Sequence, residues 1–283
     1  MITIALATFK EAVRKKIVFL IIFLTAVYLA VFSFLIYSAY NQFKEMGTGV
    51  FDIVKQMSGF VSILGFYFSG MIVAFLTIMA SVGAVSSDIE SGTIQSVVTK
   101  PLRRSEYVLG KFLGLAALTG AYSMFLYLFL IMLNIVLGIP PLCNIDAATF
   151  LKGLLLFVFI PLALLSLCIF GSVTLKTLNN GIVVISIYIL GMVGGMMEQI
   201  GASLKIDSLF NWGIFISLVS PFDSIYRKMI SIVFSSINIA AAYAQPIFLS
   251  GSTPSNWMTA YALAFSTAFI LLALRKFNRR DIT

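Results

Sequence analysis

Six long stretches of the chain are almost free of charged side chains, and each is close to the roughly 20 residues that a helix needs to cross a bilayer. They cover roughly residues 17–40, 60–85, 112–138, 150–174, 181–197 and 258–274. Over the whole chain 60% of residues are hydrophobic and 11% are charged, whereas a soluble domain averages roughly 25% charged residues. No stretch alternates as the strands of a membrane barrel do. The sequence therefore predicts an all-α integral membrane protein with six transmembrane helices in a single domain, residues 1–283.

The distribution of lysine and arginine predicts how these helices are oriented. Thirteen basic residues fall on one side of the membrane: Lys10, Arg14, Lys15, Lys16, Lys100, Arg103, Arg104, Lys111, Lys176, Arg275, Lys276, Arg279 and Arg280. Six fall on the other: Lys44, Lys55, Lys152, Lys205, Arg227 and Lys228. Because basic residues are retained on the cytoplasmic side, both termini are expected in the cytoplasm of a multi-pass protein of the cell (inner) membrane. The net charge of +8 is expected to contact anionic lipid headgroups rather than nucleic acid.

Two segments outside the six stretches have their own patterns. Residues 1–16 place Ile2, Leu6, Phe9 and Val13 at helical spacing, which predicts an amphipathic elbow helix on the inner membrane surface and not a cleavable signal. Residues 198–256 are broken by prolines and polar residues, which predicts two short helices at the outer face or dipping into it. If both crossed instead, the chain would have eight spans and its termini would stay inside.

Several function classes lack the residues that they need. The chain has no histidine, which excludes histidine-based catalysis and histidine-ligated metals. Essentially no charge is expected deep in the spans, since Glu198 and Lys176 lie at span edges, and this disfavours an ion-coupled carrier. No nucleotide-binding loop is present, so any ATP must be held by another chain. The chain is therefore predicted to be no enzyme and to hold no cofactor or metal of its own.

Glycines recur four residues apart in two of the predicted spans. Gly110 and Gly114 lie in the third span, and Gly191 and Gly195 lie in the fifth. In a bilayer such spacing lets two helix backbones approach closely. Packing within the chain is the favoured interpretation, and a dimer interface remains the alternative.

Charge is concentrated between the second and third spans, at residues 86–111. Ser87 and Glu90 have the spacing of a capping box, and Gly92 is expected to end the descending helix. Thr93 can then begin a short helix that presents apolar residues on one face and ends at Pro101. A short helix of this kind, apolar on one side and flanked by charge, is suited to a groove on another protein. A basic loop that serves only membrane topology is the alternative.

The same stretch, SSDIESGTIQSVVTKPLRRSEYVLGKFLG, resembles the cytoplasmic signature of the type-2 ABC transporter permeases (the ABC-2 family). Ser87 and Asp88 stand where an arginine and a glutamate are common in that family. The tail at residues 277–282, FNRRDI, is similar to the family's C-terminus. The segment SPFDSIYR, residues 220–227, resembles the subgroup linked to maturation of multicopper enzymes and nitrous oxide reductase.

This resemblance implies a permease subunit, an exporter that works as a homodimer or with a related permease. A separate cytoplasmic ATPase would bind ATP and magnesium and push on a coupling helix at residues 93–100. The residues implied in this coupling are Asp88, Glu90, Gly92, Thr93, Ile94, Val97, Val98, Lys100, Pro101, Arg103, Arg104 and Lys111. An ATP-independent channel or carrier, and a membrane scaffold that transports nothing, remain alternatives.

Overall fold

The computed structural model describes residues 1–44, 51–93, 104–137, 142, 145–235 and 252–279. The regular structure in these ranges is entirely helical. Its helices are α1 (Ile2–Arg14), α2 (Lys16–Lys44), α3 (Phe51–Ser81), α4 (Ser86–Glu90), α6 (Arg104–Val136), α7 (Ala147–Thr174), α8 (Thr177–Leu204), α9 (Asp207–Val219), α10 (Phe222–Val233) and α11 (Asn256–Asn278).

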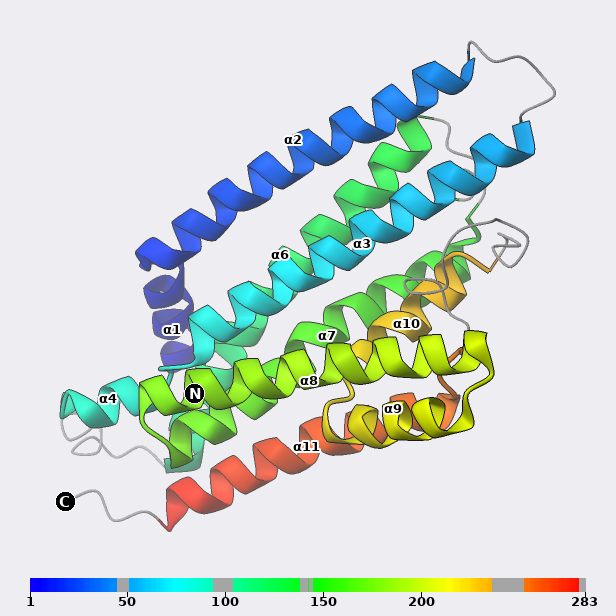
Figure 1. Cartoon of the computed structure of the whole chain (residues 1–283). Coiled ribbons are helices and arrows are strands. Elements are labelled where there is room, and N and C mark those ends of the chain that lie inside the picture. The colour runs from blue at the N-terminus through cyan, green and yellow to red at the C-terminus, as the bar shows by residue number, and fades with distance from the viewer. Residues whose placement is uncertain (45–50, 94–103, 138–141, 143–144, 236–251, 280–283) are drawn as a thin grey trace.

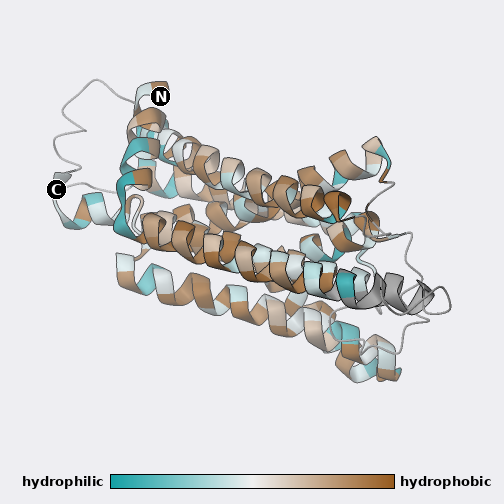
Figure 2. Ribbon diagram, turned by 90° about the horizontal axis from the view of Figure 1, so that it is seen from above, coloured by the Kyte–Doolittle hydropathy of each residue, from teal (hydrophilic) through white to brown (hydrophobic). Residues whose placement is uncertain are grey.

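Within the described ranges, six helical segments are long and apolar enough to cross a membrane, as predicted. These segments are Lys16–Ser38, Ser58–Glu90, Arg104–Val136, Ala147–Thr174, Thr177–Leu204 and Asn256–Asn278. In Figure 1 the long helices run side by side, and in Figure 2 hydrophobic residues follow their length while hydrophilic residues gather at the two ends. The helices are longer than the apolar stretches of the sequence. Hydropathy identifies the part of a helix that lies in the hydrocarbon, whereas the helix itself can continue beyond it.

The beginning of α1 and the end of α11 lie at one end of the bundle, together with α4 (Figures 1 and 2). We call this the proximal end and the opposite one, where α8 ends, the distal end. An even number of spans requires the two termini to share an end, and the structure has that arrangement.

The core of the bundle is centred on α7, which packs against α3, α6, α10 and α11. Three buried rings meet there: the ring centroid of Phe66 lies 5.7 Å from that of Tyr127 and 6.2 Å from that of Phe157. In contrast, α2, α8 and α11 turn apolar side chains outward, with Phe23 70% and Trp257 85% exposed. Exposing so much apolar surface to water is unfavourable, so lipid or another subunit must cover it.

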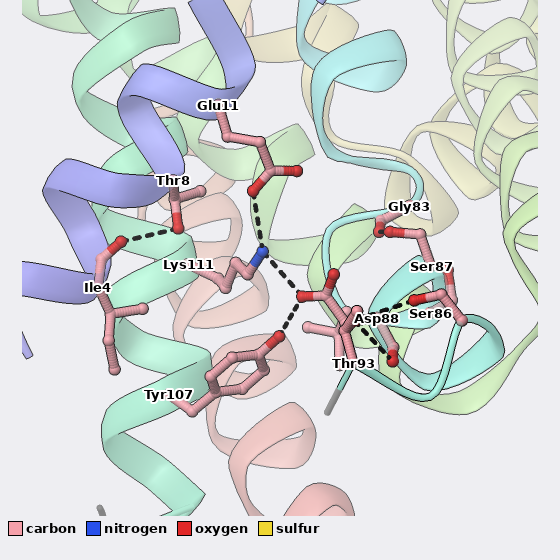
Figure 3. Close-up of polar contacts among 12 residues, drawn as sticks. Ile4, Thr8, Glu11, Gly83, Ser86, Ser87, Asp88, Thr93, Tyr107 and Lys111 are labelled. Carbon is pink, nitrogen blue, oxygen red and sulfur yellow. Dashed lines mark hydrogen bonds and ion pairs between the residues drawn. The ribbon is translucent and has the colours of Figure 1, made fainter. Parts of the chain in front are cut away.

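Helix α1 packs along the beginning of α6 and has three distinct faces. Its small residues, including Thr8 and Ala12, are buried against the bundle. Ile2 and Leu6, on the apolar face that the sequence identified, are exposed. Its polar face carries Glu11 toward α6 (Figure 3). The apolar face is therefore available to lipid, as expected of an elbow helix at a membrane surface.

Helices α9 and α10 form a hairpin that lies against the bundle from the distal end. Helix α9 runs back along α8, and a Cβ on Gly213 would come within 2.5 Å of the Glu198 backbone nitrogen, so glycine permits this close packing. The chain turns at Ser220 and Pro221 into α10, which packs on α7. With 13 and 12 residues, the two helices are roughly 20 Å long and too short to cross about 30 Å of hydrocarbon.

Candidate functional site

Several long-range polar contacts meet at α4, a five-residue helix at the proximal end. The chain leaves α3 through a turn at residues 82–85. The backbone N–H groups of Val85 and Ser86 both donate to the Ser172 hydroxyl of α7, at 2.8 and 2.9 Å. Ser86 also shares a hydrogen bond of 2.7 Å with the Thr177 hydroxyl of α8. Side chains from two other spans thus bind the beginning of α4.

Asn180 fastens the preceding turn to the same two spans. Its fully buried amide nitrogen donates to the Val82 carbonyl at 2.7 Å and to the Cys168 carbonyl at 3.0 Å. The amide reaches this position because α7 has Gly171 there, where a Cβ would collide with the Asn180 oxygen. The ends of α3, α7 and α8 are therefore held as one unit.

Glu90, the last residue of α4, caps the beginning of α8. Its carboxylate accepts from the Thr177 backbone N–H at 2.8 Å and from the Thr177 hydroxyl at 3.2 Å. The first backbone N–H groups of a helix have no partner within the helix, and the helix dipole favours negative charge there. The local N-cap residue, Lys176, makes no side-chain cap. The cap of α8 is therefore supplied by a segment 87 residues earlier in the chain.

Asp88 joins α4 to α1 and α6 through Lys111 (Figure 3). The Lys111 amine lies 2.9 Å from the Asp88 carboxylate and 3.4 Å from the Glu11 carboxylate of α1. Tyr107, one turn before Lys111 on α6, donates its hydroxyl to Asp88. The Lys111 side chain is only 9% exposed, so two carboxylates compensate a cation that has lost most of its water. The Tyr107 ring stacks on Phe277 of α11, with centroids 5.8 Å apart.

These contacts define what we call the α4 junction: Glu11, Val82, Ser86, Asp88, Glu90, Tyr107, Lys111, Ser172, Thr177 and Asn180. Gly92 follows α4 with a φ of +72°, a conformation that favours glycine. The descending helix α3 itself ends earlier than predicted, at Ser81. The Thr93 hydroxyl then donates to the Asp88 carbonyl at 3.2 Å.

The centre of the predicted coupling helix lies outside the described residues. This applies to Ile94, Val97, Val98, Lys100, Pro101 and Arg103. The chain is described again from Arg104, whose guanidinium donates to the Asn278 carbonyl at the end of α11, at 3.4 Å. Both sides of residues 94–103 are therefore bonded to the proximal ends of other helices.

Two expectations from the sequence need correction. Ser87 and Glu90 do not form a capping box: α4 begins at Ser86 without a side-chain cap, and Glu90 bonds to Thr177 instead. The expectation of essentially no buried charge is also wrong, because Lys111 and Glu198 are 7% exposed. Both errors arise because the partners come from distant parts of the chain.

The paired glycines lie against helices of the same chain. A Cβ on Gly110 would approach Ile4 to 2.8 Å, and one on Gly114 would collide with the Ala5 carbonyl, so both glycines face α1. Gly191 faces Ser220 at the tip of the α9–α10 hairpin, and Gly195 faces Asp223 on α10. In these positions the four glycines bring α1 close to α6 and the hairpin close to α8.

A second charged group, at the distal side, was not anticipated. Arg227 of α10 is 3% exposed and donates to Glu198 of α8 at 2.6 Å and to Asp223 at 2.9 Å. Ser252 bonds to both Glu198 and Arg227. We call Glu198, Asp223 and Arg227 the hairpin ion cluster, because it fastens α10 to α8. The sequence did contain a signal for this cluster. Asp223 and Arg227 are four residues apart in an apolar stretch, and Glu198 lies in a predicted span or at its edge.

Fold and site together define a polytopic membrane subunit whose charged residues connect helices. Within the described residues, no three acidic, cysteine or histidine side chains lie close enough to hold a metal ion. The sequence profile described as "ABC-2 family transporter protein" matches residues 2–282. The chain therefore belongs to this family, whose members are non-catalytic, membrane-spanning permeases that work with an ATPase. No curated protein gave a significant match.

Proposed function

We propose that this chain is the permease of an ABC-2 exporter and that residues 93–103 receive the movement of the ATPase. The observation that carries this proposal is the α4 junction. Asp88 and Glu90 immediately precede the coupling segment, and they bind α6, α1 and α8 through Lys111, Glu11 and Thr177.

A connecting segment transmits a displacement only if its ends cannot bend independently of the helices. Hydrogen bonds that involve a charged group contribute about 1.5–3 kcal/mol each. The α4 junction has several of these, which link α4 to α1, α6 and α8, and Arg104 binds α11 on the other side of the segment. Movement at residues 94–103 would therefore shift the proximal ends together.

In this proposal Asp88, Glu90 and Lys111 act within the permease. The residues that contact the ATPase are then the apolar Ile94, Val97 and Val98, with the basic Lys100, Arg103 and Arg104 beside acidic groups of its groove. The proximal end, with both termini, faces the cytoplasm. Two copies of the chain form the path, and two ATPases bind ATP and magnesium below.

The paired glycines face helices of their own chain, so the second copy is expected to contact other surfaces, among them the exposed apolar faces of α2 and α8. The segment at residues 220–227 supports, by resemblance, the subgroup linked to multicopper-enzyme and nitrous oxide reductase maturation. Its two charged residues at four-residue spacing, Asp223 and Arg227, belong to the hairpin ion cluster.

The proposal is tested by purifying the tagged protein from native membranes and identifying what accompanies it. We expect an ATPase with a nucleotide-binding loop, and we expect Val97→Asp to lose it. The control is Leu204→Asp, which places the same charge on an exposed apolar residue at the distal end of α8.

Three results would contradict the proposal. A protein that purifies without an ATPase, under conditions in which a known ABC complex survives, would indicate an ATP-independent channel or carrier. If wild type and Val97→Asp retain the ATPase equally, residue 97 does not contribute to the contact with the ATPase. An ATPase that binds without any flux in reconstituted vesicles would indicate a scaffold.

A further inference from the structure

A groove of about 720 Å³ lies between α7 and α11 at the proximal end of the bundle. Three cations from the last turns of α11 line it: Arg275, Lys276 and Arg279. The remaining lining residues are Phe170, Val173, Thr174 and Leu272. Among the described residues, no carboxylate lines the groove.

The groove has an apolar part and a basic part, arranged along the helix axis. Leu272 and Phe170 lie within the candidate spans, one turn or more before the ends of their helices. Arg279 follows Leu272 by seven residues, which is about 10 Å along a helix. The two rings of Phe170 and Phe269 pack with centroids 5.2 Å apart, where α7 and α11 are in contact. A ligand in the groove would therefore meet apolar side chains at one end and cations at the other.

We propose that this groove binds one anionic phospholipid, with its phosphate among Arg275, Lys276 and Arg279 and an acyl chain against Phe170 and Leu272. Guanidinium groups bind phosphate oxygens through paired hydrogen bonds. A free phosphate would leave the apolar wall uncovered. A soluble protein such as an ATPase could reach the cations but not the wall at the depth of the hydrocarbon.

The site would act on the same helix ends as the α4 junction. Helix α11 touches that junction through Phe277, whose ring stacks on Tyr107. It also accepts a hydrogen bond from Arg104 at Asn278, one residue before Arg279. A bound lipid would therefore hold α11 against α7 where the junction ends. This inference needs only that the chain is a membrane protein, and it stands or falls separately from the identity of the ATPase.

The test is native mass spectrometry of the detergent-solubilised full chain, with any subunit that co-purifies. Dioleoylphosphatidylglycerol and dioleoylphosphatidylcholine are added separately, and the fraction of protein retaining one lipid is measured. We expect selective retention of the anionic lipid. Arg275→Gln with Arg279→Gln should weaken retention roughly 30-fold, since each cation near an anionic headgroup contributes about a fivefold change.

The matched control is Lys10→Gln with Arg14→Gln, which removes two exposed cations from α1 near the same end of the bundle. We expect this variant to retain the lipid as wild type does. If the double α11 variant does not purify as a folded protein, Lys276→Gln alone should reduce retention about fivefold.

Four results would overturn the proposal. They are equal retention of the neutral and anionic lipids, equal loss in the α1 and α11 variants, unchanged retention in Lys276→Gln, and glycerol 3-phosphate binding as tightly as the lipid. The last result would indicate a site for free anions. Loss of a co-purifying protein from the α11 variants, with lipid retention unchanged, would instead assign the groove to a protein partner.

Discussion

At the scale of single residues, the carboxylates of α4 act as connectors. Glu90 accepts a hydrogen bond from the first backbone N–H of α8, and Asp88 forms an ion pair with the buried amine of Lys111. Each contact joins residues of two different helices, so each restricts one helix relative to another. The polar cap at Glu90 is exposed, whereas the Lys111 pair is nearly enclosed, and the two are therefore expected to tolerate substitution differently.

Replacing Glu90 with glutamine should weaken coupling without unfolding the protein. The amide side chain keeps an oxygen that can accept from Thr177 but loses the charge that the α8 dipole favours, a change of about 0.3–1 kcal/mol. We expect the ATPase to remain bound and active while substrate moved per ATP falls severalfold in reconstituted vesicles. Glu106→Gln, in the first turn of α6 and outside the junction, is the control. An unchanged ratio in Glu90→Gln would show that the cap does not transmit movement.

At the scale of elements, the structure contains two closely packed helix pairs. Helix α1 rests on α6 through Gly110 and Gly114, and α8 receives the hairpin through Gly191 and Gly195. At each place a charged contact accompanies the glycines: Lys111 with Glu11, and Arg227 with Glu198. Small residues permit the approach, and the ion pairs fix which residues meet.

Gly114→Ala and Gly120→Ala should have opposite effects on stability, although both lie in α6. A methyl group at 114 would collide with the Ala5 carbonyl, whereas at 120 the nearest atom is Val158 Cγ1 at 3.8 Å. We expect Gly114→Ala to lose about 1–3 kcal/mol through steric strain. Gly120→Ala should gain about 0.5–1 kcal/mol from the better helix former. Thermal unfolding in detergent measures both, and equal stability of the two variants would mean that α1 does not pack on Gly114.

Arg227→Met should destabilise the distal hairpin strongly. It leaves Glu198 and Asp223 buried without their cation, and breaking a buried pair in this way costs about 3–5 kcal/mol. Lys228→Met is the control, since that amine donates to a backbone carbonyl, that of Pro254. Protease sensitivity and thermal unfolding of the purified variants report the difference. If Arg227→Met is as stable as the control, the hairpin ion cluster does not hold α10 against α8.

At the scale of the whole molecule, the bundle has two unlike ends. The proximal end holds the termini, the α4 junction and the basic groove, while the distal end receives the α9–α10 hairpin. The count of basic residues predicts that the proximal end faces the cytoplasm.

Single-cysteine labelling of intact cells should therefore separate the two ends. In a variant without Cys143, we expect Asp207→Cys at the start of α9 to react with an impermeant maleimide from outside. Thr3→Cys on α1 should react only after the membrane is permeabilised. Both positions are exposed, and the remaining Cys168 is buried. The reverse labelling pattern would invert the proposed topology.

Hydropathy was sufficient to predict the six spans, because a continuous apolar stretch of this length has few alternatives to a membrane helix. Interrupted hydropathy also predicted two short helices between residues 198 and 256. Helix α9 lies close to the expected residues 209–219, whereas α10 begins at Phe222, seven residues before the expected start at Met229. The side-chain pairings could not be predicted. The contacts of Asp88 with Lys111 and of Glu90 with Thr177 depend on how the helices pack, and a single sequence does not reveal this packing. Glu198 directly follows the apolar stretch at residues 181–197 and was therefore assigned to a span edge, but its pairing with Arg227, 29 residues later, was not predicted.

The cap that Glu90 provides for α8 also orders events during synthesis. Lys111 emerges soon after Asp88, so α1, α4 and α6 can be connected early. Thr177 follows Glu90 by 87 residues, which at about 5–20 residues per second is a delay of roughly 4–17 seconds. Until α7 and the beginning of α8 are made, the turn before α4 lacks Ser172 and Asn180 and Glu90 lacks Thr177. A nascent chain that stalls before that point would keep this end open, and membrane quality control could recognise it as unfinished.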